Sequence, residues 1–90
     1  MRALRWWGAY RKDIKRLVKR GYDLSTLYLI IELLRGKEST LPPAARPHKL
    51  SGEYAGLWEC HIGHDWLLIY NLTDKEVLLA RTGTHADLFE

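Results

Sequence analysis

The sequence is poor in the features that mark secreted, membrane-spanning and disulfide-stabilised chains. Its one cysteine, Cys60, cannot form an internal disulfide, which fits a reducing cytoplasm, and its place in a strand-like run predicts inert burial. No run approaches the roughly 20 apolar residues of a membrane span, and residues 1–7 alternate aromatic and charged side chains. Neither membrane association nor a signal peptide is therefore expected. The 90 residues, 47% of them apolar, predict one ordered domain over residues 1–90.

Two residue types are unevenly distributed along the chain. Histidine is absent before residue 48, and all four histidines follow: His48, His61, His64 and His85. Residues 1–46 carry 11 Lys/Arg and 4 Asp/Glu, a net charge of +7, whereas residues 47–90 carry 3 and 7, a net charge of −4. A half that attracts polyanions is thus joined to a half whose groups transfer protons near neutral pH. This combination favours chemistry on nucleic acid.

Hydrophobic spacing in the first half predicts a short strand and a helical hairpin. Residues 2–7 are consistent with a strand, and from Gly8 apolar residues recur at helical intervals until Gly21, a typical C-terminal cap. Asp23 or Ser25 can cap a second helix that runs to Arg35. This second helix is apolar almost all round, which indicates either deep burial, the more frequent case, or a second surface for a partner.

The second half changes to a period of two after an irregular loop over residues 36–47, which is rich in Gly, Ser and Pro. Runs over residues 54–62, 65–71 and 76–82, separated by turns at 63–64 and 73–75, predict a three-stranded antiparallel meander. The expected fold class is α+β, with a short N-terminal strand and a helical hairpin packed on one face of a small antiparallel β-sheet.

The predicted register brings four polar side chains to one end of this sheet. The turn at residues 63–64 places His61 opposite Trp66, give or take a residue, and Asp65 within reach of His61. The third strand returns along the second, so the chain leaving it at His85 comes back to the same end. Strand alternation places Arg81 on the face of residues 77 and 79. We expect a cluster of His61, Asp65, Arg81 and His85 at an edge of the face away from the helices.

Such a cluster suits metal-independent cleavage of RNA. The ribose 2′-hydroxyl must lose a proton, the charge of the phosphorane must be offset, and the leaving 5′-oxygen must gain a proton. Histidine can perform either proton transfer, and arginine grips two phosphate oxygens. Aromatic side chains such as Trp66 or Phe89 can stack on a splayed base.

Most of these residues have ordinary explanations when they are taken singly. His64 is most simply an exposed turn residue, and His48 a loop histidine bonded to backbone. Asp65 can start the strand after the turn, and Arg81 can be a surface ion-pair partner. The HxxH spacing of His61 and His64 across a tight turn, without thiols nearby, is a weak metal signal, so no metal or other cofactor is predicted.

The first predicted helix carries six basic residues against one acid, Asp13, within ten positions: Arg11, Lys12, Lys15, Arg16, Lys19 and Arg20. A charged helix face is often merely solvated. This excess is larger than solubility requires, and it favours salt-sensitive contact with ribosomal RNA.

Three segments carry a resemblance to a known family: residues 61–70 (HIGHDWLLIY), 72–75 (LTDK) and 81–89 (RTGTHADLF). With residues 48–52 (HKLSG) and 10–13 (YRKD), they strongly resemble the YafQ branch of the RelE/ParE toxin superfamily. The resemblance covers nearly the whole chain and is most specific in residues 81–89. It implies a RelE-like microbial RNase fold.

The resemblance also implies a function and partners. It implies a type II toxin that enters the A site of the 30S ribosomal subunit and cuts mRNA, with adenine-rich codons favoured by close relatives. It implies a DinJ-like antitoxin, a ribbon-helix-helix DNA-binding protein, which neutralises the toxin and represses the shared operon with it. Operator DNA would then be contacted only through the antitoxin.

Carried over position by position, the resemblance implies that His48, His61, Asp65 and His85 form the catalytic polar set. Arg81 matches the phosphate-contacting arginine and Phe89 the C-terminal aromatic RNA contact. We expect His85 to protonate the leaving oxygen, Asp65 or His61 to help remove the 2′-proton, and His48 to lie near the phosphate or base. Trp66 is expected to pack behind Asp65 more than to contact RNA.

Two rival functions remain at this point. One is a toxin of the same superfamily that poisons DNA gyrase, although such relatives lack the histidine–aspartate set. The other is a non-catalytic module that binds RNA or the ribosome, whose histidines are incidental. Toxicity that depends on His85 would separate the leading hypothesis from both.

Overall fold

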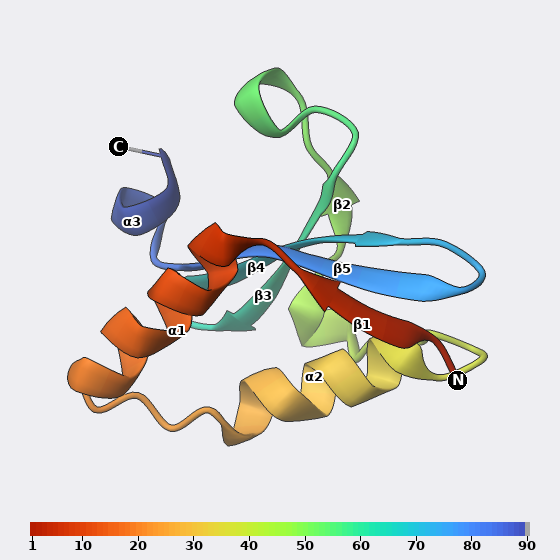
Figure 1. Cartoon of the computed structure of the whole chain (residues 1–90), viewed down its shortest axis with the longest axis horizontal. Coiled ribbons are helices and arrows are strands. Elements are labelled where there is room, and N and C mark those ends of the chain that lie inside the picture. The colour runs from red at the N-terminus through yellow and green to blue at the C-terminus, as the bar shows by residue number, and fades with distance from the viewer. Residues whose placement is uncertain (90) are drawn as a thin grey trace.

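The computed structural model describes residues 1–89 as a five-stranded sheet with two helices on one face and a short third helix on the other (Figure 1). The strand order is β1-β5-β4-β3-β2. The central meander is antiparallel and comprises β3 (Trp58–Gly63), β4 (Trp66–Leu72) and β5 (Glu76–Gly83). At the two edges, β1 (Ala3–Trp6) runs parallel to β5, and β2 (His48–Lys49) pairs with β3. The predicted α+β class, N-terminal strand and meander are confirmed.

The end of the first helix and the start of the second lie close to the positions predicted from Gly21 and Asp23. Helix α1 (Gly8–Lys19) closes with two hydrogen bonds, from the Gly21 N–H to the Val18 carbonyl at 3.0 Å and from the Tyr22 N–H to the Leu17 carbonyl at 3.0 Å. This Schellman pattern needs a left-handed residue, and Gly21 has φ +83°. At the start of α2 (Ser25–Arg35), the Asp23 carboxylate accepts hydrogen bonds from the backbone N–H and the hydroxyl of Ser25.

The two faces of the sheet bury different cores. Under α1 and α2, the larger core contains Leu17, Leu27 and Leu34 against the sheet residues Leu68 and Leu79, all nearly inaccessible to solvent. A smaller core on the opposite face packs the sheet against α3 (His85–Phe89) and the chain around Tyr54; its buried members are Tyr54, Leu67, Ile69, Ala80 and Leu88. Figure 1 shows α3 on the side of the sheet opposite α2.

Two local features of the predicted meander were wrong. The tight turn consists of His64 and Asp65, not of residues 63 and 64, because Gly63 pairs with Trp66 and Asp65 adopts the left-handed conformation at φ +51°. Residues 54–57 are not strand: the chain forms a 3-10 turn at Gly52–Tyr54 and enters β3 only at Trp58. Asp65 tolerates positive φ better than most residues, which lets the turn shift by one position.

Helix α3 was not predicted from the sequence. It begins after β5 with reciprocal hydrogen bonds, since the Thr84 N–H donates to the Asp87 carboxylate and the Asp87 N–H donates to the Thr84 hydroxyl, both at 3.1 Å. This arrangement is a capping box. A five-residue helix is too short to show a hydrophobic period. The Thr84-x-x-Asp87 pattern is therefore the feature of the sequence that could have predicted the start of α3. Within residues 1–89, no helix is long and apolar enough to cross a membrane.

Candidate functional site

The face of the sheet that bears the smaller core also carries a row of polar side chains from neighbouring strands. His61 pairs with Leu67, and Glu59 pairs with Ile69, which in turn pairs with Arg81. Because cross-strand partners share a face, these polar residues lie on the face of the smaller core.

The position of Arg81 on this face corrects the alternation predicted for β5. A bulge at Ala80, between the pairs Ile69–Arg81 and Tyr70–Leu79, inserts one residue into β5. The inserted residue reverses the inside–outside pattern beyond it. Arg81 therefore does not share the face of Val77 and Leu79, which belong to the larger core.

Asp65 and His85 form the closest pair of proposed catalytic side chains. The Asp65 Oδ1 accepts the backbone N–H of His85 at 3.0 Å and lies 2.9 Å from the Nδ1 of its ring. The backbone hydrogen bond, followed by that from the ring, holds the pKa of the Asp65 carboxyl below its ordinary value. An ionised Asp65 accepts a hydrogen bond from Nδ1–H, so the ring form that satisfies it leaves Nε2 of His85 for a substrate.

His61 lies with Asp65 and His85 on the wall of a groove of about 690 Å³ between the β3–β4 turn, the start of α2 and the 3-10 turn at Pro43–Ala45. Burial lowers the pKa of the His61 imidazole, and the guanidinium of Arg46, which also lines the groove, lowers it further. The neutral form of His61 is therefore favoured near pH 7. His64 is exposed at the rim of the same groove, in the turn, as predicted.

His48 stands at the end of the polar row, beside a carboxylate that the sequence did not single out. Its Nε2 lies 3.3 Å from the Glu59 Oε1, and its Nδ1 lies 3.2 Å from the Arg46 carbonyl. The rings of His48 and His61 are 6.5 Å apart. Glu59 is only 5% exposed, and a buried carboxylate is costly without a partner. No motif marks Glu59 in the sequence, because its role depends on pairing between strands.

Arg81 is held within the fold by two partners. Its Nε and Nη2 donate to the Asp13 carboxylate of α1 at 2.7 and 3.0 Å, and its Nη1 donates to the Tyr54 hydroxyl at 3.0 Å. These hydrogen bonds, led by those to Asp13, raise the pKa of Arg81 above its ordinary value. Three of its five N–H groups are thus occupied, which leaves two for a phosphate.

The two candidate aromatic contacts have different surroundings. Phe89 is 45% exposed, with its ring 5.8 Å from that of Tyr54 and 6.1 Å from that of His85, so it can still receive a base. Trp66 is 8% exposed, and its Nε1–H donates to the Thr82 hydroxyl at 2.9 Å. The indole belongs to the core under the helices, in line with the expectation that Trp66 packs within the fold more than it contacts RNA.

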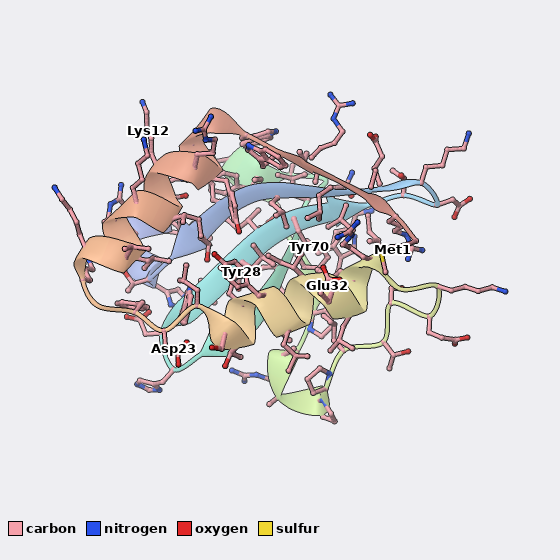
Figure 2. The ribbon with its side chains drawn as sticks, turned by 60° about the horizontal axis from the view of Figure 1, so that its bottom comes forward. Met1, Lys12, Asp23, Tyr28, Glu32 and Tyr70 are labelled. Atoms are coloured by element: carbon pink, nitrogen blue, oxygen red, sulfur yellow. The ribbon has the colours of Figure 1, made fainter. Side chains whose placement is uncertain are left out.

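The six basic residues of the first helix divide into two groups. Arg16 and Arg20 form ion pairs with Asp87, and Arg16 also lies 3.6 Å from Asp13. Among residues 1–89, the remaining four form no ion pair: Arg11, Lys12, Lys15 and Lys19. All four are exposed, and Figure 2 shows Lys12 projecting outward from α1.

The described part of the chain contains no group of three or more His, Cys, Asp or Glu side chains placed to hold a metal ion. His48 and Glu59 form one pair, and Asp65 and His85 form another.

Comparison with known proteins agrees with the fold and the residue pattern. Residues 2–90 match the family model described as the bacterial toxin YafQ of type II toxin–antitoxin systems. The chain is 41% identical over 88 residues to the mRNA interferase toxin YafQ of Escherichia coli K12, covering 98% of this chain and 96% of the relative.

Two solved structures place the similarity in three dimensions. The crystal structure of the E. coli DinJ–YafQ toxin–antitoxin complex matches with a TM-score of 0.89 and 40% identity, covering 99% of this chain and 98% of that one. The crystal structure of a metal-bound toxin from Helicobacter pylori matches with a TM-score of 0.88 and 35% identity, covering 99% of this chain and 100% of that one. The chain belongs to the YafQ family of toxins from bacterial type II toxin–antitoxin systems.

Proposed function

We propose that this chain is a ribosome-dependent endoribonuclease toxin, which cuts translated mRNA in the A site by acid–base catalysis without a metal ion and so inhibits translation. Its E. coli relative carries the name mRNA interferase toxin. The observation that carries the proposal is the Asp65–His85 pair beside His61 on one groove. A histidine oriented by a carboxylate and a second histidine kept neutral are the two proton carriers that the reaction needs.

The geometry favours a particular division of roles. His61 takes the proton from the 2′-hydroxyl, because its lowered pKa leaves the ring unprotonated near pH 7. The 2′-oxygen then forms a bond to phosphorus while the bond from phosphorus to the 5′-oxygen breaks. His85 donates the Nε2 proton to that 5′-oxygen, and the Asp65 carboxylate stabilises the charged imidazole before the transfer. The products are a 2′,3′-cyclic phosphate and a 5′-hydroxyl.

The remaining residues of the site bind substrate. The guanidinium of Arg46, which lines the groove, offsets the charge of the phosphorane, and the two unoccupied N–H groups of Arg81 contact a phosphate of the bound RNA. His48 lies beside His61, where it can contact the phosphate or base, and Phe89 stacks on a base. On α1, the exposed residues Arg11, Lys12, Lys15 and Lys19 attract ribosomal RNA through a salt-dependent interaction.

The cognate antitoxin is a DinJ-like, ribbon-helix-helix protein, and the toxin–antitoxin complex represses the shared operon by binding operator DNA through the antitoxin. The E. coli DinJ–YafQ complex supports this partner. An apolar groove of about 660 Å³ between β1, α1 and α2 provides a surface for it; its lining includes Trp6, Tyr10, Ile14, Tyr28 and Ile31. Figure 2 labels Tyr28, which is 54% exposed, and Glu32 on α2 beside this groove. Because Arg11 and Lys15 form part of the lining, the occupant is an amphipathic antitoxin segment with acidic residues.

Mapping of mRNA 5′ ends in programmed ribosomes, with and without the protein, tests cleavage, ribosome dependence and codon choice together. His85→Ala should lower the cleavage rate by roughly 100- to 10,000-fold, the usual contribution of a general acid. His64→Ala should cleave at the wild-type rate. A chelator that removes transition metals but leaves the ribosome's magnesium should not change the rate. Full activity of folded His85→Ala would disprove the mechanism, and inhibition of gyrase supercoiling by the purified chain would favour the rival toxin class.

A further inference from the structure

Helix α3 carries both the proposed acid, His85, and the proposed base contact, Phe89, yet it is too short to be stable alone. It spans five residues, and its buried side chain is Leu88. Isolated helices well beyond this length are marginal in water. Contacts with the rest of the fold must therefore fix where the imidazole of His85 stands.

Asp87 is the residue at which those contacts converge. Its carboxylate accepts a bidentate pair of hydrogen bonds from Arg20, with Nη1–Oδ2 at 2.7 Å and Nη2–Oδ1 at 2.9 Å. Arg16 Nη1 adds a contact to Oδ1 at 3.5 Å, and the Thr84 N–H donates to Oδ2 at 3.1 Å. Both arginines belong to the last turn of α1 or its C-cap, so the carboxylate ties α3 to the end of α1.

The carboxylate of Asp87 is fitted into the structure and is not a loose surface group. Its side chain is 11% exposed. A Cβ at position 83 would lie 2.9 Å from Asp87 Oδ2, and Gly83 has φ +156°. The absence of a side chain at Gly83 thus lets the carboxylate approach the end of β5. The hydrogen bonds from Arg20 also hold the pKa of Asp87 well below its usual range, so the group is ionised at neutral pH.

A second arginine–carboxylate pair in the chain shows the contrast. Arg5 and Glu76 also join distant segments, through one contact of 3.3 Å, but their side chains are 68% and 42% exposed. Exposed single contacts of this kind contribute little. Bidentate pairs fix geometry as well as charge.

We propose that Arg20 and Asp87 are positioning residues of the nuclease site: they hold α3 against the end of α1 and so set the position of His85. The proposal rests on the proposed function for its catalytic consequence. It reassigns Arg20, which the charge pattern had suggested as an RNA contact, to the internal support of the catalytic histidine. Asp65 then orients the ring of His85, while the Arg20–Asp87 pair holds the helix that carries it.

The two roles of Arg20 make opposite predictions for Asp87→Asn. If Arg20 serves chiefly to attract RNA, removal of the neighbouring acid strengthens ribosome binding and leaves the cleavage step intact. If Arg20 positions α3 through Asp87, the same substitution slows the cleavage step although the protein has become more basic. Displacements of about 1 Å at a catalytic group can cost roughly 100-fold.

Single-turnover cleavage on programmed ribosomes, with toxin concentration varied, separates the maximal rate from the half-saturating concentration. We expect Arg20→Ala and Asp87→Asn to lower the maximal rate by roughly 10- to 100-fold without tightening binding. The maximal rate of Arg20→Lys should fall between the rates of these variants and that of wild type. The matched control Arg5→Ala should behave as wild type. Tighter binding with an unchanged maximal rate in Asp87→Asn would overturn the proposal.

Hydrogen exchange tests the support of α3 independently of catalysis. The Leu88 N–H donates to the Thr84 carbonyl at 3.2 Å, so its exchange reports the opening of α3. Exchange at Leu88 should be faster in Arg20→Ala and Asp87→Asn, and unchanged in Arg5→Ala, with unaltered far-UV circular dichroism for all. Equal exchange in all variants would refute the support of α3. If the wild-type protein did not cleave RNA, the proposed function would be disproved. The exchange data would still decide whether Arg20 and Asp87 hold α3 in place.

Discussion

Replacing Asp13 by asparagine should destabilise the fold by several kcal/mol, because this carboxylate is the buried counter-charge of Arg81. Its side chain is 1% exposed, and its Oδ2 lies 2.7 Å from the Arg81 Nε and 3.1 Å from the Thr82 N–H. Its Oδ1 lies 3.0 Å from the Arg81 Nη2. Asparagine keeps the shape but replaces one acceptor with an NH₂ group that faces the guanidinium.

The size of the effect follows from the burial of the two partners. Removing one member of a buried ion pair costs about 3–5 kcal/mol, and the 19% exposure of Arg81 favours the lower end, about 3 kcal/mol. A domain of this length has a total stability of roughly 5–13 kcal/mol. Each kcal/mol shifts the midpoint of unfolding by about 4–8 °C at this size, so the midpoint should fall by roughly 12–24 °C.

Thermal and urea unfolding followed by far-UV circular dichroism at pH 7 measure this loss. Asp23→Asn is the matched control: its carboxylate is exposed near the start of α2, where asparagine serves about as well. The double variant Asp13→Leu with Arg81→Met should recover part of the stability, since apolar replacements of a buried pair are often neutral. The recovery is incomplete because the buried Thr82 N–H loses its acceptor. A fall of less than about 4 °C in the unfolding midpoint of Asp13→Asn would show that the Asp13–Arg81 pair does not stabilise the fold as a buried ion pair.

Three further predictions concern the site and the partner surface. On the acidic limb of the pH–rate profile, the midpoint should lie below the ordinary histidine pKa of about 6.5, because the pKa of the base, His61, is lowered. Arg46→Gln should raise that midpoint, and a midpoint that does not move would argue against His61 as the base. Trp66→Phe should lower the free energy of unfolding by about 1 kcal/mol in thermal unfolding, because the hydrogen bond to Thr82 is lost, and it should leave the cleavage rate unchanged. Weaker ribosome binding by the folded variant would instead indicate that Trp66 contacts RNA. Tyr28→Asp should abolish antitoxin binding in calorimetry while cleavage persists, and an unchanged Kd would remove the groove as the docking surface.

The elements that could be predicted from the sequence are those with strong local patterns. The helical period that ends at Gly21 and the order of the strands in the meander depend on residues close together in the chain, and the structure confirms both. The predicted cap of α2 is wrong, because the N-cap residue is Leu24 and no side chain caps the helix, although Asp23 accepts two hydrogen bonds from Ser25. Hairpin pairing also predicted that His61, Asp65 and His85 meet, and they line one groove. Arg81, the fourth member of the predicted cluster, does not line this groove and is bound to Asp13 and Tyr54 instead.

The features that escaped prediction depend on register and on long-range pairing. A single inserted residue, Ala80, turns Arg81 to the other face of β5, and nothing in the alternation of small and apolar residues marks it. Asp13 and Glu59 are buried carboxylates whose partners lie elsewhere in the chain, so nothing near either residue in the sequence indicates its ion pair.

The +7 charge of the first 46 residues is therefore not one uniform attractive surface. Several of its arginines bind the fold together: Arg20 holds α3 through Asp87, and Arg2 donates to the carbonyls of Thr73, Leu34 and Gly36. The lysines of α1 form no ion pair among residues 1–89. This division follows from chemistry, since the planar, multi-donor guanidinium fixes geometry whereas the ammonium acts as a hydrated point charge. Loss of a lysine on α1 should thus flatten the salt dependence of ribosome binding, by about one unit of logarithmic slope per lost phosphate contact, whereas loss of Arg20 should slow the cleavage step.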